Sequence, residues 1–144
     1  MRGRIVVNSK NKGRRGEYEY RDLIRSIFNT KTDRVPGSGG FKSLGANTGD
    51  MLSGSLPKVL KPYIQEVKYE KTLRLFPYIM QCQTGNSKIT KEEYLKLEKK
   101  DLKIQDWMVA YRCPAEYNIP KNFIIIMPAV ELLGLLKELE DLRK

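Results

Sequence analysis

Histidine is absent from the 144 residues of this sequence. Its absence excludes catalytic triads and dyads that use an imidazole, zinc hydrolysis with histidine ligands, and nucleases whose general base is histidine. Cysteine is scarce, because only Cys82 and Cys113 occur, and they form no CxxC motif for zinc. We expect both thiols to be buried and unreactive in a reducing cytosol. Any hydrolytic chemistry must therefore depend on carboxylates, lysine and a metal ion.

Long apolar runs are absent as well. The longest, at 123–127, is far shorter than the roughly 18 residues that suggest a membrane span. No hydrophobic segment follows the basic N-terminus, as one would in a signal peptide. We therefore expect no membrane association and an intracellular, cytoplasmic location. A length of 144 residues suits one packed domain, and 40% hydrophobic residues can supply its core.

Positive charge is abundant and unevenly distributed. Lys and Arg number 27 against 17 Asp and Glu, which gives a net charge of +10. Residues 1–48 carry 11 basic and 4 acidic side chains, whereas residues 91–144 carry 10 of each. The first 14 residues contain no acidic side chain, so we expect a basic arm that neutralises phosphates of a nucleic acid. The alternative is a solvated tail that only aids solubility.

Hydrophobic periodicity predicts an α/β protein with a single mixed β-sheet flanked by helices. The expected helices are 15–29, 72–84, 91–103 and the leucine-rich C-terminal segment; the expected strands are 50–52, 63–68, 107–113 and 123–127, with a glycine-rich loop at 36–48. We expect one domain, 1–144, in which 84–106 is a helical insertion. The C-terminal leucines are expected to pack against the sheet, and sharing them with a second subunit is the alternative.

The most informative local pattern is Asp50 followed by Glu66, Val67 and Lys68. Side chains two positions apart on a strand share a face, so Glu66 and Lys68 should project together. If Asp50 lies alongside, two carboxylates and a lysine meet at one sheet edge. A divalent cation would keep both carboxylates ionised, and lysine could stabilise charge on a phosphate. The alternative is a turn at Asp50 and an ordinary surface pair of Glu66 with Lys68.

Four stretches of this sequence, in order, carry a family resemblance. Residues 50–54 and 64–68 resemble the PD-(D/E)XK nuclease core, although Gly49 stands where that motif has proline. Residues 12–17 and 34–39 resemble the opening motifs of archaeal and phage-type Holliday-junction resolvases. The resemblance covers about residues 10–85 and implies a restriction-endonuclease-like core. The segment 84–106 has no counterpart in it.

The resemblance implies roles for particular residues. Glu17, Asp50 and Glu66 match metal-binding carboxylates, Lys68 matches the motif lysine, and Ser38 matches a loop serine near the scissile strand. Glu19 competes with Glu17, which we prefer because it stands four residues after Gly13. Gln83, with Gln81 as the alternative, falls where nucleases of this fold carry a helix-borne glutamine. The residues expected to bind DNA are Lys12, Arg14, Arg15, Arg34 and Gln83. The implied cofactor is Mg²⁺, for which Mn²⁺ can substitute, and the implied assembly is a homodimer on four-way DNA junctions.

Two other functions stay open. A repair, flap-cutting, branched-DNA or restriction-type nuclease would use the same residues on another DNA substrate. A basic DNA-binding protein without catalysis would need the acidic residues only for structure. A nucleotide cofactor is not expected, because the glycine-rich loop lacks the spacing that places lysine beside Ser or Thr at a helix start.

Overall fold

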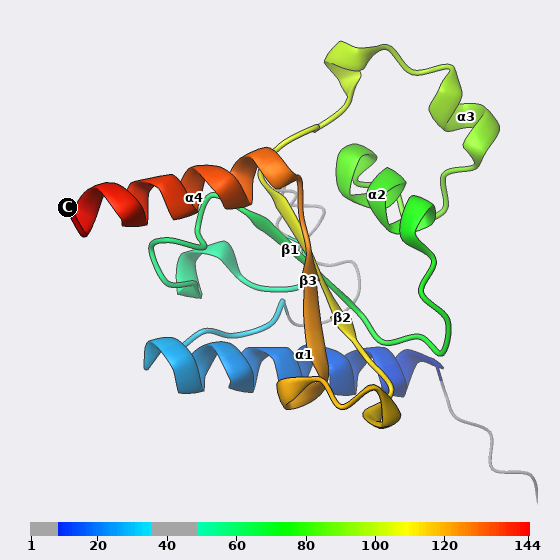
Figure 1. The fold of residues 1–144 in the computed structure, drawn as a ribbon. Helices are drawn as coiled ribbons and strands as arrows, with labels where there is room; N and C mark the ends of the chain where they lie inside the picture. Colours follow the sequence, from blue (N-terminus) through cyan, green and yellow to red (C-terminus); the bar gives the residue numbers. More distant parts are fainter. Residues whose placement is uncertain (1–8, 36–48) are drawn as a thin grey trace, which may run out of the picture.

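The computed structural model describes residues 9–35 and 49–144. Three strands form one mixed sheet in the order β1, β2, β3. Strand β1 (Ile64–Lys68) runs parallel to β2 (Trp107–Arg112), and β3 (Phe123–Ile126) runs antiparallel to β2. The α/β class with a single mixed sheet, flanked by helices, is therefore confirmed (Figure 1). Strand β1, which carries Glu66 and Lys68, lies at one edge of the sheet.

Helix α1 (Ser9–Phe28) buries Tyr20 and Ile24, which are one turn apart on its apolar face. It ends before Asn29, whose φ of 54° is the left-handed conformation common just after a helix. The helix begins six residues earlier than the expected position 15, so Lys12 and Arg14 belong to it. The basic arm expected over 1–14 is thus helical from Ser9 onward, and its first eight residues lie outside the described part.

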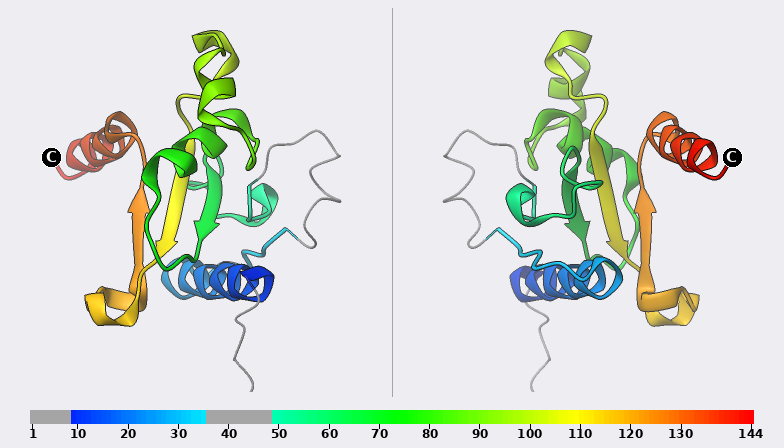
Figure 2. Two further views of the ribbon diagram at one scale, coloured as in Figure 1. Left: turned by 90° about the vertical axis from the view of Figure 1, so that its right-hand side faces the viewer. Right: turned by 90° about the vertical axis from the view of Figure 1, so that its left-hand side faces the viewer.

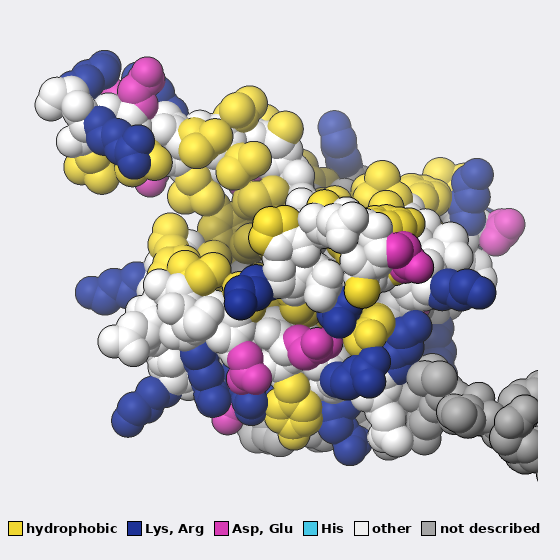
Figure 3. Space-filling view, turned by 60° about the horizontal axis from the view of Figure 1, so that its bottom comes forward, with side chains coloured by type: hydrophobic (Ala, Val, Ile, Leu, Met, Phe, Trp, Pro, Cys, Tyr) yellow, Lys and Arg dark blue, Asp and Glu magenta, His cyan; other side chains and the backbone are white. Residues whose placement is uncertain are grey.

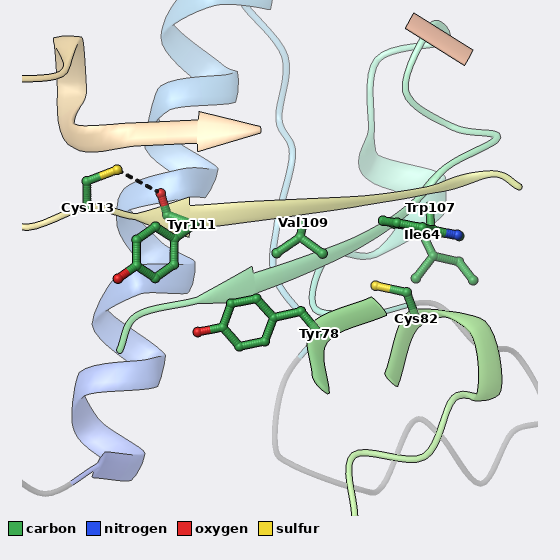
Figure 4. Packing of buried hydrophobic residues seen from close by; sticks show 7 residues of the cluster. All are labelled: Ile64, Tyr78, Cys82, Trp107, Val109, Tyr111 and Cys113. Carbon is green, nitrogen blue, oxygen red and sulfur yellow. Dashed lines mark hydrogen bonds between the residues drawn. The ribbon is translucent and has the colours of Figure 1, made fainter. Parts of the chain in front are cut away.

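Two hydrophobic clusters form the core, one beside each of the helices α1 and α2 (Leu75–Thr84). On the α1 side, Tyr20 and Ile24 pack with Met51, Val67 and Ala110. On the α2 side, Figure 4 shows seven buried residues packed together: Ile64, Tyr78, Cys82, Trp107, Val109, Tyr111 and Cys113. Ile64 and Val67, three positions apart on β1, thus enter different clusters, as the pleat of a strand requires.

No strand forms at 50–52, contrary to the sequence prediction. Gly49 makes one parallel bridge with Gln65, and Met51 makes one antiparallel bridge with Arg34. Gly49 has a φ of 69°, which turns the backbone out of the extended conformation and interrupts the ladder. A short 3₁₀ helix, η2 (Ser53–Ser55), follows directly. Asp50 therefore lies between two isolated bridges.

The segment between α2 and β2 carries little regular structure. The predicted helix at 91–103 is reduced to α3 (Lys91–Leu95) and a 3₁₀ turn, η3 (Lys99–Asp101). The Thr90–Glu93 capping box is present as the sequence indicated, with side-chain-to-backbone hydrogen bonds in both directions. Figure 1 shows this segment projecting from the sheet beside α2. Two further 3₁₀ turns, η4 (Ala115–Tyr117) and η5 (Pro120–Asn122), connect β2 to β3.

Helix α4 (Ala129–Leu142) forms as predicted but does not pack as expected. None of its residues is buried, and Val130, Leu133 and Leu142 are 73%, 62% and 83% exposed. Figure 2 shows the helix on the β3 side of the sheet, away from α1 and α2, and Figure 3 shows its hydrophobic side chains at the surface. The expected packing against the sheet is therefore wrong, because α4 extends outward from the end of β3. No helix in the described ranges is long and apolar enough to cross a membrane.

Candidate active site

Asp50 is held against the edge of β1 by its backbone and its side chain. Its N–H donates to the carbonyl oxygen of Gln65 at 2.7 Å, and its Oδ2 accepts the N–H of Val67 at 2.7 Å. The chain can approach this closely because Gly49 lacks a side chain: a Cβ there would lie 2.5 Å from the Gln65 carbonyl oxygen. The φ of 69° at Gly49 also excludes the proline of the usual motif, whose φ is fixed near −65°. The sequence departure at this position therefore has a structural cause.

Glu66 and Lys68 project from β1 toward α2, where one glutamine contacts both. Gln81 Nε2 donates to Glu66 Oε2 at 3.3 Å, and Lys68 Nζ donates to Gln81 Oε1. Glu66 is only 5% exposed. The Lys68 ammonium also lies 5.4 Å from the centroid of the Tyr78 ring. A single amide thus fixes the positions of the motif carboxylate and the motif lysine.

The glutamine at this position is Gln81, whereas the sequence interpretation preferred Gln83. Gln83 points to the projecting segment instead, where its Oε1 accepts the hydroxyl of Tyr94. The difference follows from helix geometry, because residues two positions apart on a helix do not share a face. The site therefore contains the alternative glutamine, and Gln83 helps to attach α3 to α2.

Glu17 reaches the site from α1, and an arginine accompanies it. Arg34 Nε donates to Glu17 Oε1 at 2.9 Å, and the two side chains are 15% and 20% exposed. Burial raises the pKa of Glu17 and the negative charge of Asp50 raises it further, while Arg34 and Arg14 oppose both effects without cancelling them. Glu19 instead pairs with Arg112 at 3.1 Å. Of the two competing glutamates, Glu17 is thus the one whose carboxylate interacts with Asp50.

The three carboxylates have suitable chemistry for a hard cation but do not form a closed cluster. Glu17, Asp50 and Glu66 offer only oxygen, which Mg²⁺ prefers. Within residues 9–35 and 49–144, no three acidic or cysteine side chains lie close enough together to hold a metal ion. The expected three-carboxylate site is therefore not closed, and Glu17 pairs with Arg34. The donor set fits a divalent cation, and the ion pair competes with it.

The basic residues expected to contact DNA fall into separate groups. Figure 3 shows Lys and Arg side chains over much of the face formed by α1, with a few acidic ones among them. Lys12 and Arg15 lie beside the ring of Tyr69, which also has Arg112 next to it. Arg34 is engaged by Glu17, and Ser38 lies outside the described residues. Arg112 was not singled out from the sequence as a member of such a group.

The two cysteines take no part in this arrangement. Both are free and buried, as the sequence indicated. Burial raises the pKa of the Cys82 thiol to about 12, and the nearby charges of Glu66 and Asp50 act in the same direction. A thiol with so high a pKa is protonated at neutral pH and is a poor nucleophile.

Comparisons with known proteins agree with the nuclease core. The family model described as "Phage putative PDDEXK endonuclease" matches residues 8–127. Protein D14 of Escherichia phage T5 is 37% identical over 67 residues, which is 46% of this chain and 42% of the phage protein. The match therefore spans less than half of that relative's length, and no solved structure is significantly similar. Because the family model covers most of the chain, the protein belongs to this family of phage PDDEXK endonucleases.

Proposed function

We propose that this protein is a Mg²⁺-dependent DNA endonuclease that resolves four-way junctions as a homodimer. Two observations together carry the proposal. The Asp50 side chain accepts the N–H of Val67, and the residues on either side of Val67, Glu66 and Lys68, are bridged by Gln81. The proposal is supported by the position of these acidic and basic groups along β1, the edge strand that residues 49 and 50 contact. The net charge of +10 supports a polyanionic substrate.

The residues divide the work of phosphodiester hydrolysis as follows. A divalent cation held by Glu17, Asp50 and Glu66 would activate water and neutralise charge on the phosphate, and Mn²⁺ could replace Mg²⁺. Lys68 would donate to the scissile phosphate or orient the attacking water. Gln81 would hold the side chains of Lys68 and Glu66 in fixed positions relative to each other. Asp50 is positioned by a backbone N–H, so its placement depends on the strand itself.

The homodimer is supported by the exposed apolar face of α4. Leu132, Leu133, Leu136 and Leu139 are all at least 41% exposed, and large exposed apolar patches mark interaction sites. A second copy of this chain is the partner that would cover this face of α4 in a junction resolvase, because cutting two symmetric DNA strands needs two active sites. We expect light scattering to report a dimer at micromolar concentration. The pair Leu133→Glu with Leu136→Glu should give a monomer, whereas Lys137→Glu on the same helix should not.

The decisive experiment compares an immobile four-way DNA junction with a linear duplex of the same sequence, with Mg²⁺ or EDTA. Paired, symmetric, Mg²⁺-dependent nicks on the junction alone are the expected result. Equal cutting of the duplex would overturn junction selectivity and favour a repair or restriction-type nuclease. Binding without cleavage in several divalent metals would favour the non-catalytic alternative.

Two variants connect the result to the site. Glu66→Gln should lower cleavage by at least about 100-fold while leaving junction binding intact, because it removes a charge without changing the shape. Glu98→Gln is the matched control, since the Glu98 side chain forms an exposed pair with Lys100. Equal activity of the two variants would contradict a catalytic role for Glu66.

A further inference from the structure

Tyr69 lies directly after Lys68 and is surrounded by three cations. Its ring centroid is 4.8 Å from Lys12 Nζ, 5.2 Å from Arg15 Cζ and 5.0 Å from Arg112 Cζ. Arg15 Nη2 also donates to the Tyr69 hydroxyl at 2.7 Å. These four residues, here called the Tyr69 cluster, come from α1, β2 and the end of β1. Two separate elements, α1 and β2, thus bring like charges to one aromatic ring.

The backbone is built to accept this ring. A Cβ on Gly16 would lie 3.0 Å from Tyr69 Cβ, so a glycine in the middle of α1 makes room for the tyrosine. Lys68 pairs with Tyr111 in the parallel register, which places Tyr69 alongside Arg112 at the ends of two neighbouring strands. Lys12 and Arg15 are three residues apart and therefore share a face of α1. The cluster is thus defined by helix and strand geometry.

The Tyr69 cluster carries an excess of positive charge. One carboxylate, that of Glu19, pairs with the cluster, at 3.1 Å from Arg112. Lys12 and Arg15 contact a neutral ring and a neutral hydroxyl instead. Cation–π contacts hold a cation in place without neutralising it. A bound anion would remove the mutual repulsion of the three cations, and a phosphate accepts hydrogen bonds from both arginine and lysine.

The position of the cluster identifies the anion. Lys68 and Tyr69 are consecutive, so a DNA strand whose scissile phosphate contacts Lys68 passes close to the Tyr69 cluster. Because side chains alternate along a β-strand, Lys68 at the end of β1 faces α2, while Tyr69 faces α1. We propose that Lys12, Arg15 and Arg112, gathered on Tyr69, form a subsite for a backbone phosphate of the same DNA strand, near the phosphate that is cut. This inference rests on the proposed nuclease function.

The subsite is tested by binding, which requires no cleavage. Junction affinity is measured in EDTA over a range of salt concentrations for the wild type, Lys12→Gln and Arg15→Gln. Each variant should weaken binding about threefold to tenfold and reduce the slope of log affinity against log salt by about 0.9, the value for one lost phosphate contact. Arg143→Gln, at the end of α4, removes the same charge at a distance and should leave the slope unchanged. A slope for Arg15→Gln equal to that of Arg143→Gln would overturn the subsite.

Neutral phosphates locate the contact on the DNA. Single methylphosphonates are placed on either side of the mapped cut, and each should weaken wild-type binding where a phosphate is held. A methylphosphonate at the phosphate that the Tyr69 cluster binds should not weaken binding by Arg15→Gln any further, because this variant already lacks the contact with that phosphate. Additive losses of affinity at every position would contradict the assignment.

The Tyr69 ring is tested with two variants. Tyr69→Leu should weaken junction binding as much as Arg15→Gln does, whereas Tyr69→Phe should retain most of the affinity. If Tyr69→Leu does not fold, the salt slopes of Lys12→Gln and Arg15→Gln test the subsite.

The two proposals fail in different ways. If the wild type cuts nothing but Arg15→Gln lowers the salt slope relative to Arg143→Gln, the nuclease function is wrong and a phosphate contact at the Tyr69 cluster stands. If the wild type cuts junctions and Arg15→Gln binds like Arg143→Gln, the nuclease function stands and the subsite is wrong.

Discussion

Arg34 Nε donates to Glu17 Oε1 at 2.9 Å, at the point where Glu17 interacts with Asp50. Both partners are largely buried, with side chains 15% and 20% exposed. The guanidinium therefore offsets the repulsion between two carboxylates that would otherwise raise the free energy of the fold. It also occupies the carboxylate that the proposed metal site requires, so Arg34 and a divalent cation compete for Glu17.

Replacing Arg34 should make the fold more dependent on metal. In metal-free buffer, Arg34→Gln should lower the free energy of unfolding by about 1–3 kcal/mol, because a buried carboxylate loses its charged partner. Adding Mg²⁺ or Ca²⁺ should then raise the melting temperature of the variant more than that of the wild type. Arg21→Gln is the control, since Arg21 pairs with Asp22 and Asp33 and not with Glu17. Equal metal-induced shifts in wild type and Arg34→Gln would separate Glu17 from the metal site.

Gly49 should not tolerate a side chain. A Cβ there would lie 2.5 Å from the Gln65 carbonyl oxygen and 2.8 Å from Ile64 Cγ2, on a backbone with a φ of 69°. We expect Gly49→Ala to lower the free energy of unfolding by about 2–4 kcal/mol and to reduce cleavage, because Asp50 would be displaced. Gly134→Ala is the opposite control: its Cβ meets nothing within 4 Å, and alanine should stabilise α4 by about 1 kcal/mol. Chemical denaturation measures both, and a neutral Gly49→Ala would refute the close approach.

Gln81 and Gln83 should differ sharply when each is replaced. Gln81→Ala removes the amide between Lys68 and Glu66, so we expect kcat to fall about 10- to 100-fold, as for other residues that orient catalytic groups. Gln83→Ala loses only its contact with Tyr94 and should leave kcat unchanged. Steady-state cleavage of a junction with saturating Mg²⁺ gives the comparison. Similar losses in both variants would indicate a general effect on α2 instead of a positioning role for Gln81.

The sequence predicted the elements that depend on local patterns. Apolar spacing located α1, α2 and α4, and apolar runs located β2 and β3, because each pattern reports which face of one element is buried. The Thr90–Glu93 capping box was readable for the same reason. The order of helices and strands, and with it the α/β class, could therefore be predicted without any knowledge of contacts.

Features that depend on contacts between distant segments were missed. The turn at Gly49 replaced a strand because its φ is set by contact with Gln65, sixteen positions away. Helix α4 has a leucine face, but periodicity does not reveal whether the sheet or another chain covers it. The Tyr69 cluster joins residues of three elements, and Gly16 inside a helix is a sequence signal for this close contact. For Gln81 and Gln83, the choice depended on which helix face meets β1.

The stability of the fold should decrease in acid because of Glu70. Burial raises the pKa of Glu70, but hydrogen bonds from Arg74 and Tyr78 outweigh it, so the pKa lies below the ordinary value of 4.5. A carboxylate with a lowered pKa in the fold stabilises it above the unfolded-state pKa, and this contribution is lost as pH falls through the folded-state value. The contribution is about 1 kcal/mol or less, because the Glu70 and Arg74 side chains are 34% and 59% exposed.

Removing the charge of Glu70 should therefore matter at neutral pH and not in acid. Glu70→Gln should melt below the wild type at pH 7, and the difference should close as pH falls from about 5 to 3, since the wild-type carboxyl is then protonated as well. Glu98→Gln, which breaks only the exposed pair with Lys100, should match the wild type at both pH values. Thermal melts followed by circular dichroism across this range decide the point. A difference between Glu70→Gln and wild type that persists unchanged at pH 3 would mean that Glu70 stabilises the fold by packing and not by its charge.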